Sequence, residues 1–124
     1  RRIMKKLLIV DDEPNIVMSL EYAFQKQGYN VFIARDGSEA LVIMEREIPD
    51  LVVLDIMMPQ VDGYETIEII KKNPAFAKAK IIFLSAKSKA ADIEKGLSLG
   101  ADLYFTKPFS VKKLIAAVDN LIRI

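Results

Sequence analysis

The chain has 124 residues, of which 52% are apolar and 28% charged, a balance that is ordinary for one globular domain. Its 18 basic and 17 acidic residues give a formal charge of +1, so the sequence lacks the basic excess of a nucleic-acid platform. It has no cysteine and no histidine, which excludes disulfides, thiolate metal sites and histidine catalysis. Any chemistry must therefore use carboxylates, hydroxyls, lysine and backbone groups.

Hydropathy along the chain bears on its location. No apolar run approaches the ~20 residues that a membrane-spanning helix needs. The apolar segment after the basic start ends at Val10, which is too early for a secretory signal. We therefore expect a cytoplasmic protein without a membrane partner, and we interpret residues 1–4 as a tag or as a linker from a longer chain.

Short apolar runs alternate with segments of helical periodicity along the chain. The strands are expected at 6–10, 29–34, 51–54, 81–84 and 103–105. The helices are expected at 14–28, 39–46, 64–72, 90–99 and 111–122. Pro14 suits the first turn of the first helix, and the last helix carries its apolar residues on one face. Five apolar strands alternating with five helices predict an α/β domain, doubly wound around a parallel sheet, that spans 1–124.

Polar residues follow four of the expected strands. Asp11-Asp12-Glu13 follows the first strand, Asp55 the third, Ser85 the fourth, and Lys107 the fifth. In open parallel sheets, ligands bind outside the carboxyl ends of the strands, so these side chains should meet at one edge. Two carboxylates ~4 Å apart repel by about 4 kcal/mol at an effective dielectric of 20, and a bound cation would offset that cost. An all-oxygen site suits Mg²⁺, and a lysine opposite it suits a phosphate.

Simpler interpretations exist for each residue taken alone. Asp12 or Glu13 would serve as an N-cap of the first helix, Ser85 as an ordinary loop residue, and Lys107 as surface charge. All of these groups, however, fall at the carboxyl ends of expected strands. The simpler interpretations would have to hold together, which favours a common site.

The four motifs appear in a fixed order. They are Leu8-Ile9-Val10-Asp11-Asp12-Glu13, Leu54-Asp55-Ile56-Met57-Met58-Pro59, Leu84-Ser85-Ala86 and Lys107-Pro108-Phe109, and Asp62 and Gly63 follow in the loop after the second motif. This ordered set resembles the CheY-like receiver domains of two-component response regulators over nearly the whole chain. The resemblance implies a flavodoxin-like sheet of strand order 2-1-3-4-5 with five helices.

The resemblance also implies roles for these residues. Asp55 would accept a phosphoryl group, Ser85 would bind that group, and Lys107 would pair with it. The implied ligands of Mg²⁺, or of Mn²⁺ in its place, are Asp11, Asp12, Asp55 and the backbone carbonyl of Met57. The donor would be the phosphohistidine of a sensor histidine kinase or phosphotransfer protein. The chain would be a signalling domain and no enzyme beyond its own phosphorylation and dephosphorylation.

The same resemblance implies a switch. Ser85 would move toward the phosphate and Tyr104 would turn into the space left behind. This would change the surface of the fourth helix, fifth strand and fifth helix for an output domain or protein, or for a phosphorylation-dependent homodimer. The fourth helix has a sparse apolar pattern that Gly96 interrupts, so we expect it to be weakly anchored.

Three other functions are weighed against this one. A haloacid-dehalogenase-like phosphatase would carry Asp-x-Asp after the first strand, whereas this chain has Asp11-Asp12-Glu13 there. A flavodoxin-like flavin binder would need a Ser/Thr/Gly-rich phosphate loop at the same place. A receiver used only as an unphosphorylated interaction module would not need the full set of residues that this chain retains.

Overall fold

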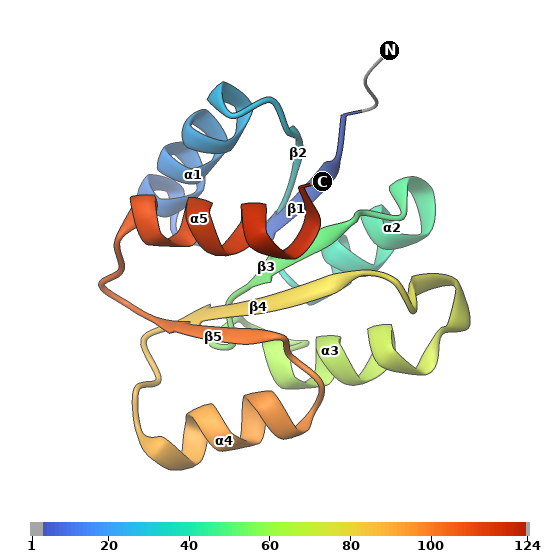
Figure 1. Cartoon of the computed structure of the whole chain (residues 1–124). Helices are drawn as coiled ribbons and strands as arrows, with labels where there is room; N and C mark the ends of the chain where they lie inside the picture. Colours follow the sequence, from blue (N-terminus) through green and yellow to red (C-terminus); the bar gives the residue numbers. More distant parts are fainter. Residues whose placement is uncertain (1–3, 124) are drawn as a thin grey trace.

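The five strands pair in parallel into one sheet of order β2-β1-β3-β4-β5, which confirms the expected architecture (Figure 1). The structure is a computed structural model that describes residues 4–123, so most of the segment 1–4 lies outside the described residues. The strands are β1 (Lys6–Val10), β2 (Asn30–Ala34), β3 (Leu51–Leu54), β4 (Lys80–Ser85) and β5 (Leu103–Thr106). The α-helices are α1 (Pro14–Lys26), α2 (Gly37–Glu47), α3 (Gly63–Lys72), α4 (Ala90–Ser98) and α5 (Val111–Ile122).

The helices cover both faces of the sheet. α1 and α5 lie on one face, and α2, α3 and α4 lie on the other (Figure 1). Successive strand residues point to opposite faces, so Leu7 and Ile9 pack under α1 and α5 while Leu8 and Val10 pack under α2 and α3. Both faces of the central strands are therefore apolar, which is why these strands appear as continuous apolar runs in the sequence.

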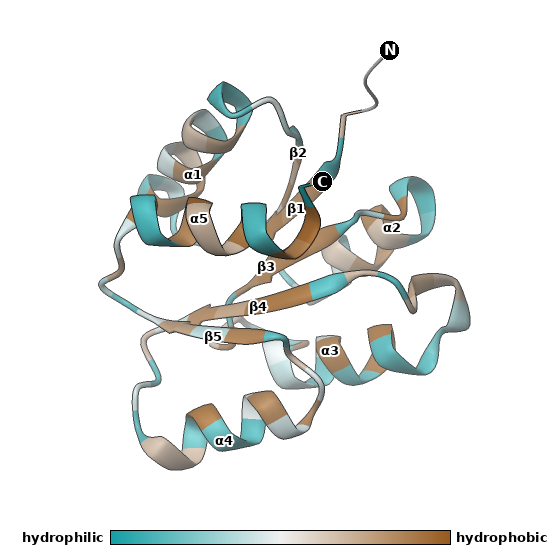
Figure 2. Cartoon of the chain, viewed as in Figure 1, coloured by the Kyte–Doolittle hydropathy of each residue, from teal (hydrophilic) through white to brown (hydrophobic). Residues whose placement is uncertain are grey.

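Hydropathy follows this layering. The central strand β3 and most of β4 are coloured as hydrophobic, whereas the helices alternate between hydrophilic and hydrophobic stretches (Figure 2). Within the described residues 4–123, no helix combines the length and the apolar character that crossing a membrane requires.

Helix boundaries depend on caps that the periodicity did not predict. α2 begins at Gly37, earlier than expected, because the Asp36 side chain accepts a hydrogen bond from the Glu39 amide. α3 begins with a reciprocal capping box between Asp62 and Glu65. A short 3-10 turn, η1 (Pro74–Phe76), follows α3 and was not expected. β4 extends to Ser85, so this serine belongs to the strand itself and is fully buried.

Gly63 allows α3 to start directly against the end of β3. Its amide donates to the Ile56 carbonyl at 2.9 Å. A Cβ atom at this position would lie 2.4 Å from the Asp55 carbonyl oxygen and 2.6 Å from the Ile56 Cα. Both neighbours are backbone atoms, so they cannot move away as a flexible side chain would. The glycine therefore fixes the distance between α3 and the segment that carries Asp55.

We predict that Gly63→Ala destabilises the fold by about 3 kcal/mol, the upper part of the usual range for overpacking. The measurement is urea unfolding followed by circular dichroism. Asn15→Ala, at an exposed position in the first turn of α1, should change stability by less than about 0.5 kcal/mol. Equal unfolding midpoints for the two variants would contradict the close approach of Gly63 to the backbone of Asp55 and Ile56.

Candidate functional site

Three carboxylates meet at the carboxyl edge of the sheet. Asp11 and Asp55 are 2% and 4% exposed, and Asp12 is exposed. One carboxylate oxygen from each lies within 4.8 Å of the others. The backbone places them, because the Asp11 amide donates to the Ala34 carbonyl at 3.1 Å and the Asp55 amide donates to the Val10 carbonyl at 2.9 Å. The sheet hydrogen bonding thus continues one residue past β1 and β3 and brings both acids to one point.

Lys107 lies among these carboxylates. Its Nζ is 2.9 Å from Asp11 Oδ2, 2.6 Å from Glu13 Oε1 and 3.6 Å from Asp55 Oδ2. Burial alone would lower the pKa of Lys107, but the hydrogen bonds that its ammonium donates to Glu13 and Asp11, together with the charge of Asp55, outweigh burial and raise this pKa. The lysine is therefore a fixed positive charge in the site.

Asp55 ionises less readily than an ordinary aspartate. Its pKa is raised to about 6, first because burial disfavours the charged form and second because the Asp11 charge repels it. Lys107 and the amides of Ile56 and Met57 act in the opposite direction. The Met57 amide reaches Asp55 Oδ1 at 3.3 Å. The ionised carboxylate is thus held at a cost that a nearby cation would reduce.

The residues present fit a hard divalent cation. Asp11, Asp12, Asp55 and Glu13 supply four carboxylates against the single ammonium of Lys107, so the described site is rich in negative charge. All the donor atoms are oxygens, and the exposure of Asp12 leaves one flank open to water. Mg²⁺ prefers such a set because it keeps several of its waters. The carbonyl of Met57 as a further ligand stays a prediction.

Ser85 ends the strand next to Asp55. Leu54 pairs with Phe83 in the register of β3 and β4, so Asp55 and Ser85 leave neighbouring strands at the same edge. Ser85 Oγ accepts a hydrogen bond from the Lys87 amide at 3.2 Å. Its carbonyl accepts from the Lys107 amide at 2.9 Å, which ties the two predicted phosphate-binding residues together through the backbone.

Tyr104 connects to the same segment from β5. Its hydroxyl donates to the Lys87 carbonyl at 2.6 Å, so Lys87 uses its amide for Ser85 and its carbonyl for Tyr104. The ring packs 5.8 Å from that of Phe83, centroid to centroid. Burial, followed by the nearby Tyr64, raises the pKa of Tyr104 to about 12, so its hydroxyl remains a donor at neutral pH. Tyr104 is half-buried in the unmodified chain, and its role in a switch stays a prediction.

The structure corrects two of the simpler interpretations. Glu13 occupies the N-cap position of α1, but its side chain makes no capping hydrogen bond and pairs with Lys107 instead. Lys107 is correspondingly not a surface charge, since its side chain is 11% exposed. The partnership of Glu13 with Lys107 was not predicted, although the position of Glu13 directly after Asp12 was a signal for it.

Gly96 also has a packing role that the sequence did not predict. A Cβ atom there would lie 2.9 Å from Phe83 Cδ2 and 3.0 Å from Tyr104 Cδ2. The glycine therefore lets α4 approach both rings closely. Gly96 therefore interrupts the apolar pattern of α4, as the sequence indicated, but it also makes this close packing possible.

The fold and this acidic edge are those expected of a receiver-type signalling domain. Comparison with known proteins supports this class. The family model described as "Response regulator receiver domain" matches residues 7–119. This chain therefore belongs to the response regulator receiver domain family.

Curated relatives fall in the same family. The chain is 44% identical over 119 residues to the alkaline phosphatase synthesis transcriptional regulatory protein PhoP of Bacillus subtilis (strain 168), covering 96% of this chain and 49% of that protein. It is 47% identical over 119 residues to the probable transcriptional regulator ycf27 of Cyanophora paradoxa, covering 96% and 48%. The chain thus spans about half the length of the curated relatives it matches.

Solved structures share the fold. The chemotaxis protein CheY4 of Vibrio cholerae superposes with a TM-score of 0.90 at 27% identity, covering 97% of this chain and 100% of that one. A BeF3-activated DrrB receiver domain superposes with a TM-score of 0.87 at 34% identity, covering 96% and 97%.

The raised pKa of Asp55 predicts how stability changes with pH when no metal is present. The folded chain holds this proton more tightly than the unfolded chain, so stability should fall as pH rises from about 4 to 6. Asp55→Asn removes the buried charge and should raise the free energy of unfolding in EDTA at pH 8 by about 2 kcal/mol. The gain should shrink toward zero at pH 4, measured by urea unfolding.

The control for this prediction is Glu68→Gln, at an exposed position of α3. It should leave stability unchanged at both pH values. If Asp55→Asn is instead less stable than the wild type at pH 8, the ionised Asp55 carboxylate does not destabilise the fold.

Proposed function

We propose that this chain is the phospho-acceptor domain of a two-component system and that Asp55 accepts the phosphoryl group. The observation that carries the proposal is the environment of Asp55. Its carboxylate is buried at a strand end, next to a lysine and within 4.8 Å of two further acids. A buried carboxylate with a fixed cation beside it can act as a nucleophile toward phosphorus, provided that the negative charge of the phosphoryl oxygens is neutralised.

In the proposed reaction, an oxygen of Asp55 attacks the phosphorus of a phosphohistidine on a partner kinase or phosphotransfer protein. The P–O bond forms, the P–N bond breaks, and the imidazole nitrogen takes the electron pair. Lys107 turns from Glu13 toward a phosphoryl oxygen, and the Ser85 hydroxyl donates to another. Mg²⁺, held by Asp11, Asp12 and Asp55, would supply charge neutralisation when bound. Water later hydrolyses the aspartyl phosphate.

Lys87 connects the site to the surface of α4 and β5, because its backbone bonds to both Ser85 and Tyr104. When the Ser85 hydroxyl turns to the phosphate, the Lys87 amide loses or lengthens its bond to Oγ. The same residue holds the Tyr104 hydroxyl through its carbonyl. We propose that this shared residue transmits phosphorylation to the surface formed by α4, β5 and α5. Met57, which is 57% exposed beside Asp55, and the side chain of Lys87 would then influence access of water.

The relatives support a proposal about the output and the partners. The PhoP and ycf27 proteins are described as transcriptional regulators and are about twice as long as this chain. We propose that residues 1–124 form one receiver unit that acts in the cytoplasm and controls transcription through another domain or protein. This unit would make no nucleic-acid contact itself, and a phosphorylation-dependent homodimer through α4, β5 and α5 is consistent with this role.

The proposal predicts a covalent product. Incubation with Mg²⁺ and a small phosphodonor should add the mass of one phosphoryl group, and hydroxylamine should remove it. The gain should fail in EDTA and in Asp55→Asn, because one lacks the cation and the other the nucleophile. Intact-protein mass spectrometry makes the measurement.

Asp50→Asn is the matched control, since Asp50 lies at the opposite end of β3 and accepts from the Lys6 amide. It should be phosphorylated as the wild type is. A mass gain that survives Asp55→Asn would sink the assignment, and a yellow protein on purification would favour the flavin binder.

Ser85→Ala should separate acceptance of the phosphoryl group from its transmission. The nucleophile remains, so the mass gain should persist, but the bond to Lys87 is already lost. We expect beryllofluoride to alter amide exchange in α4 and β5 of the wild type and to have little effect in the variant. Ser88→Ala, at an exposed position nearby, should behave as the wild type. Equal responses in Ser85→Ala and the wild type would remove Ser85 from the switch.

A further inference from the structure

α4 has few apolar anchors of its own. Gly96 is the one residue of α4 that is buried, Ile93 is partly buried and Leu97 is 44% exposed. A helix with so little buried side-chain area gains little from the hydrophobic effect. Its position on the sheet must depend on contacts that other elements supply.

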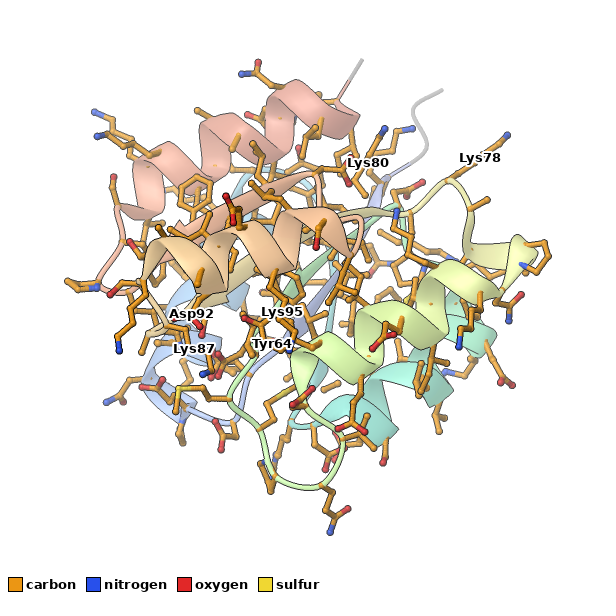
Figure 3. The ribbon with its side chains drawn as sticks, turned by 90° about the horizontal axis from the view of Figure 1, so that it is seen from below. Tyr64, Lys78, Lys80, Lys87, Asp92 and Lys95 are labelled. Carbon is orange, nitrogen blue, oxygen red and sulfur yellow. The ribbon has the colours of Figure 1, made fainter. Side chains whose placement is uncertain are left out.

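Tyr64 of α3 supplies such contacts from one side. Its side chain is 8% exposed, and its hydroxyl donates to the Asp92 carbonyl in the first turn of α4 at 3.2 Å. The ammonium of Lys95, one turn further along α4, lies 4.3 Å from the centroid of its ring, which is a cation–π distance. Figure 3 shows Tyr64, Asp92 and Lys95 grouped together between the two helices.

The backbone of Tyr64 is fixed relative to the acidic site. Its neighbour Gly63 donates to the Ile56 carbonyl at 2.9 Å and packs directly against the Asp55 carbonyl. The capping box of Asp62 and Glu65 rigidifies the same turn. Movement of the segment after Asp55 therefore carries the Tyr64 ring with it.

Tyr64 is also the first ring of a stack that reaches the switch residue. It packs edge-on against Phe83, with centroids 5.9 Å apart and planes at 72°. Phe83 packs against Tyr104 at 5.8 Å. A Cβ atom at Gly96 would lie 2.9 Å from Phe83 Cδ2 and 3.0 Å from Tyr104 Cδ2, so the placement of α4 limits the room that the Tyr104 ring has.

We propose that Tyr64 is a positioning residue of the switch: it holds α4 over the ring stack and so couples the segment after Asp55 to the inward position of Tyr104. The coupling to phosphorylation rests on the proposed function, whereas the hold on α4 does not. This second connection runs through α3 and is separate from the one through the backbone of Lys87.

The hold on α4 can be tested in the unmodified protein. Tyr64→Phe keeps the ring and removes the hydroxyl, and Lys95→Met removes the ammonium over it. Tyr29→Phe is the matched control, because Tyr29 is also buried and its hydroxyl donates to Asp119 of α5, away from α4. Amide hydrogen exchange in residues 94–98 and 114–118 is compared in all four proteins.

We expect residues 94–98 to exchange about fivefold faster in Tyr64→Phe, the effect of one net hydrogen bond, with residues 114–118 little changed. Lys95→Met should act in the same direction. Tyr29→Phe should not accelerate α4 selectively. Uniform acceleration over the chain in Tyr64→Phe, or none at all, would overturn the proposal.

A second measurement tests the proposed coupling between the segment after Asp55 and Tyr104. A residue with a purely structural role would leave this measurement unchanged. Beryllofluoride with Mg²⁺ serves as the phosphoryl analogue, and its binding is followed by titration. Tyr64→Phe should bind about threefold more weakly than the wild type, because the arrangement that favours inward Tyr104 is less populated. Tyr29→Phe should bind as the wild type does.

Unchanged affinity in Tyr64→Phe would overturn the coupling. A wild type that fails to bind beryllofluoride would overturn the receiver function and the coupling with it. The exchange comparison would still decide whether Tyr64 holds α4, so the two failures are distinguishable.

Discussion

The site depends on the ammonium of Lys107, which is largely buried among carboxylates. Lys107 lies within 3.6 Å of Asp11, Glu13 and Asp55, and burial makes both the attractions and the repulsions stronger than in water. Without this lysine, Asp11 and Asp55 would face each other as uncompensated buried charges. With it, the site still carries excess negative charge, which a further cation would offset. The balance leaves Asp55 ionisable near neutral pH, as its pKa of about 6 indicates.

The backbone makes this placement possible. The amides of Asp11 and Asp55 donate hydrogen bonds that extend the sheet, and the Lys107 amide donates a further bond to the Ser85 carbonyl. The carboxyl ends of parallel strands converge by construction, so four segments distant in sequence deliver their side chains to one edge. Because Gly63 has no Cβ atom, α3 can begin directly against the Asp55 carbonyl, next to the site.

Much of this could be predicted from the sequence because it depends on periodicity and strand ends. The strands, the helices and the edge that gathers Asp11, Asp55 and Lys107 all follow from local patterns. The partnership of Glu13 with Lys107 did not follow, since a residue before Pro14 also suits an N-cap. Gly96 likewise appeared as a weak point of α4, because a pattern along one helix does not reveal the rings packed against it from β4 and β5.

These features together explain how a small chemical change could move a helix. α4 contributes little buried area, so its position is decided by a few directional contacts that are each sensitive to geometry. One set reaches Tyr104 through the backbone of Lys87, and the other reaches α4 through Tyr64. Both begin within a few residues of the acidic edge, one after Ser85 and one after Asp55. A helix held in this way can shift when either contact changes, whereas α5, anchored by Leu114, Val118 and Ile122, cannot shift without disrupting the core.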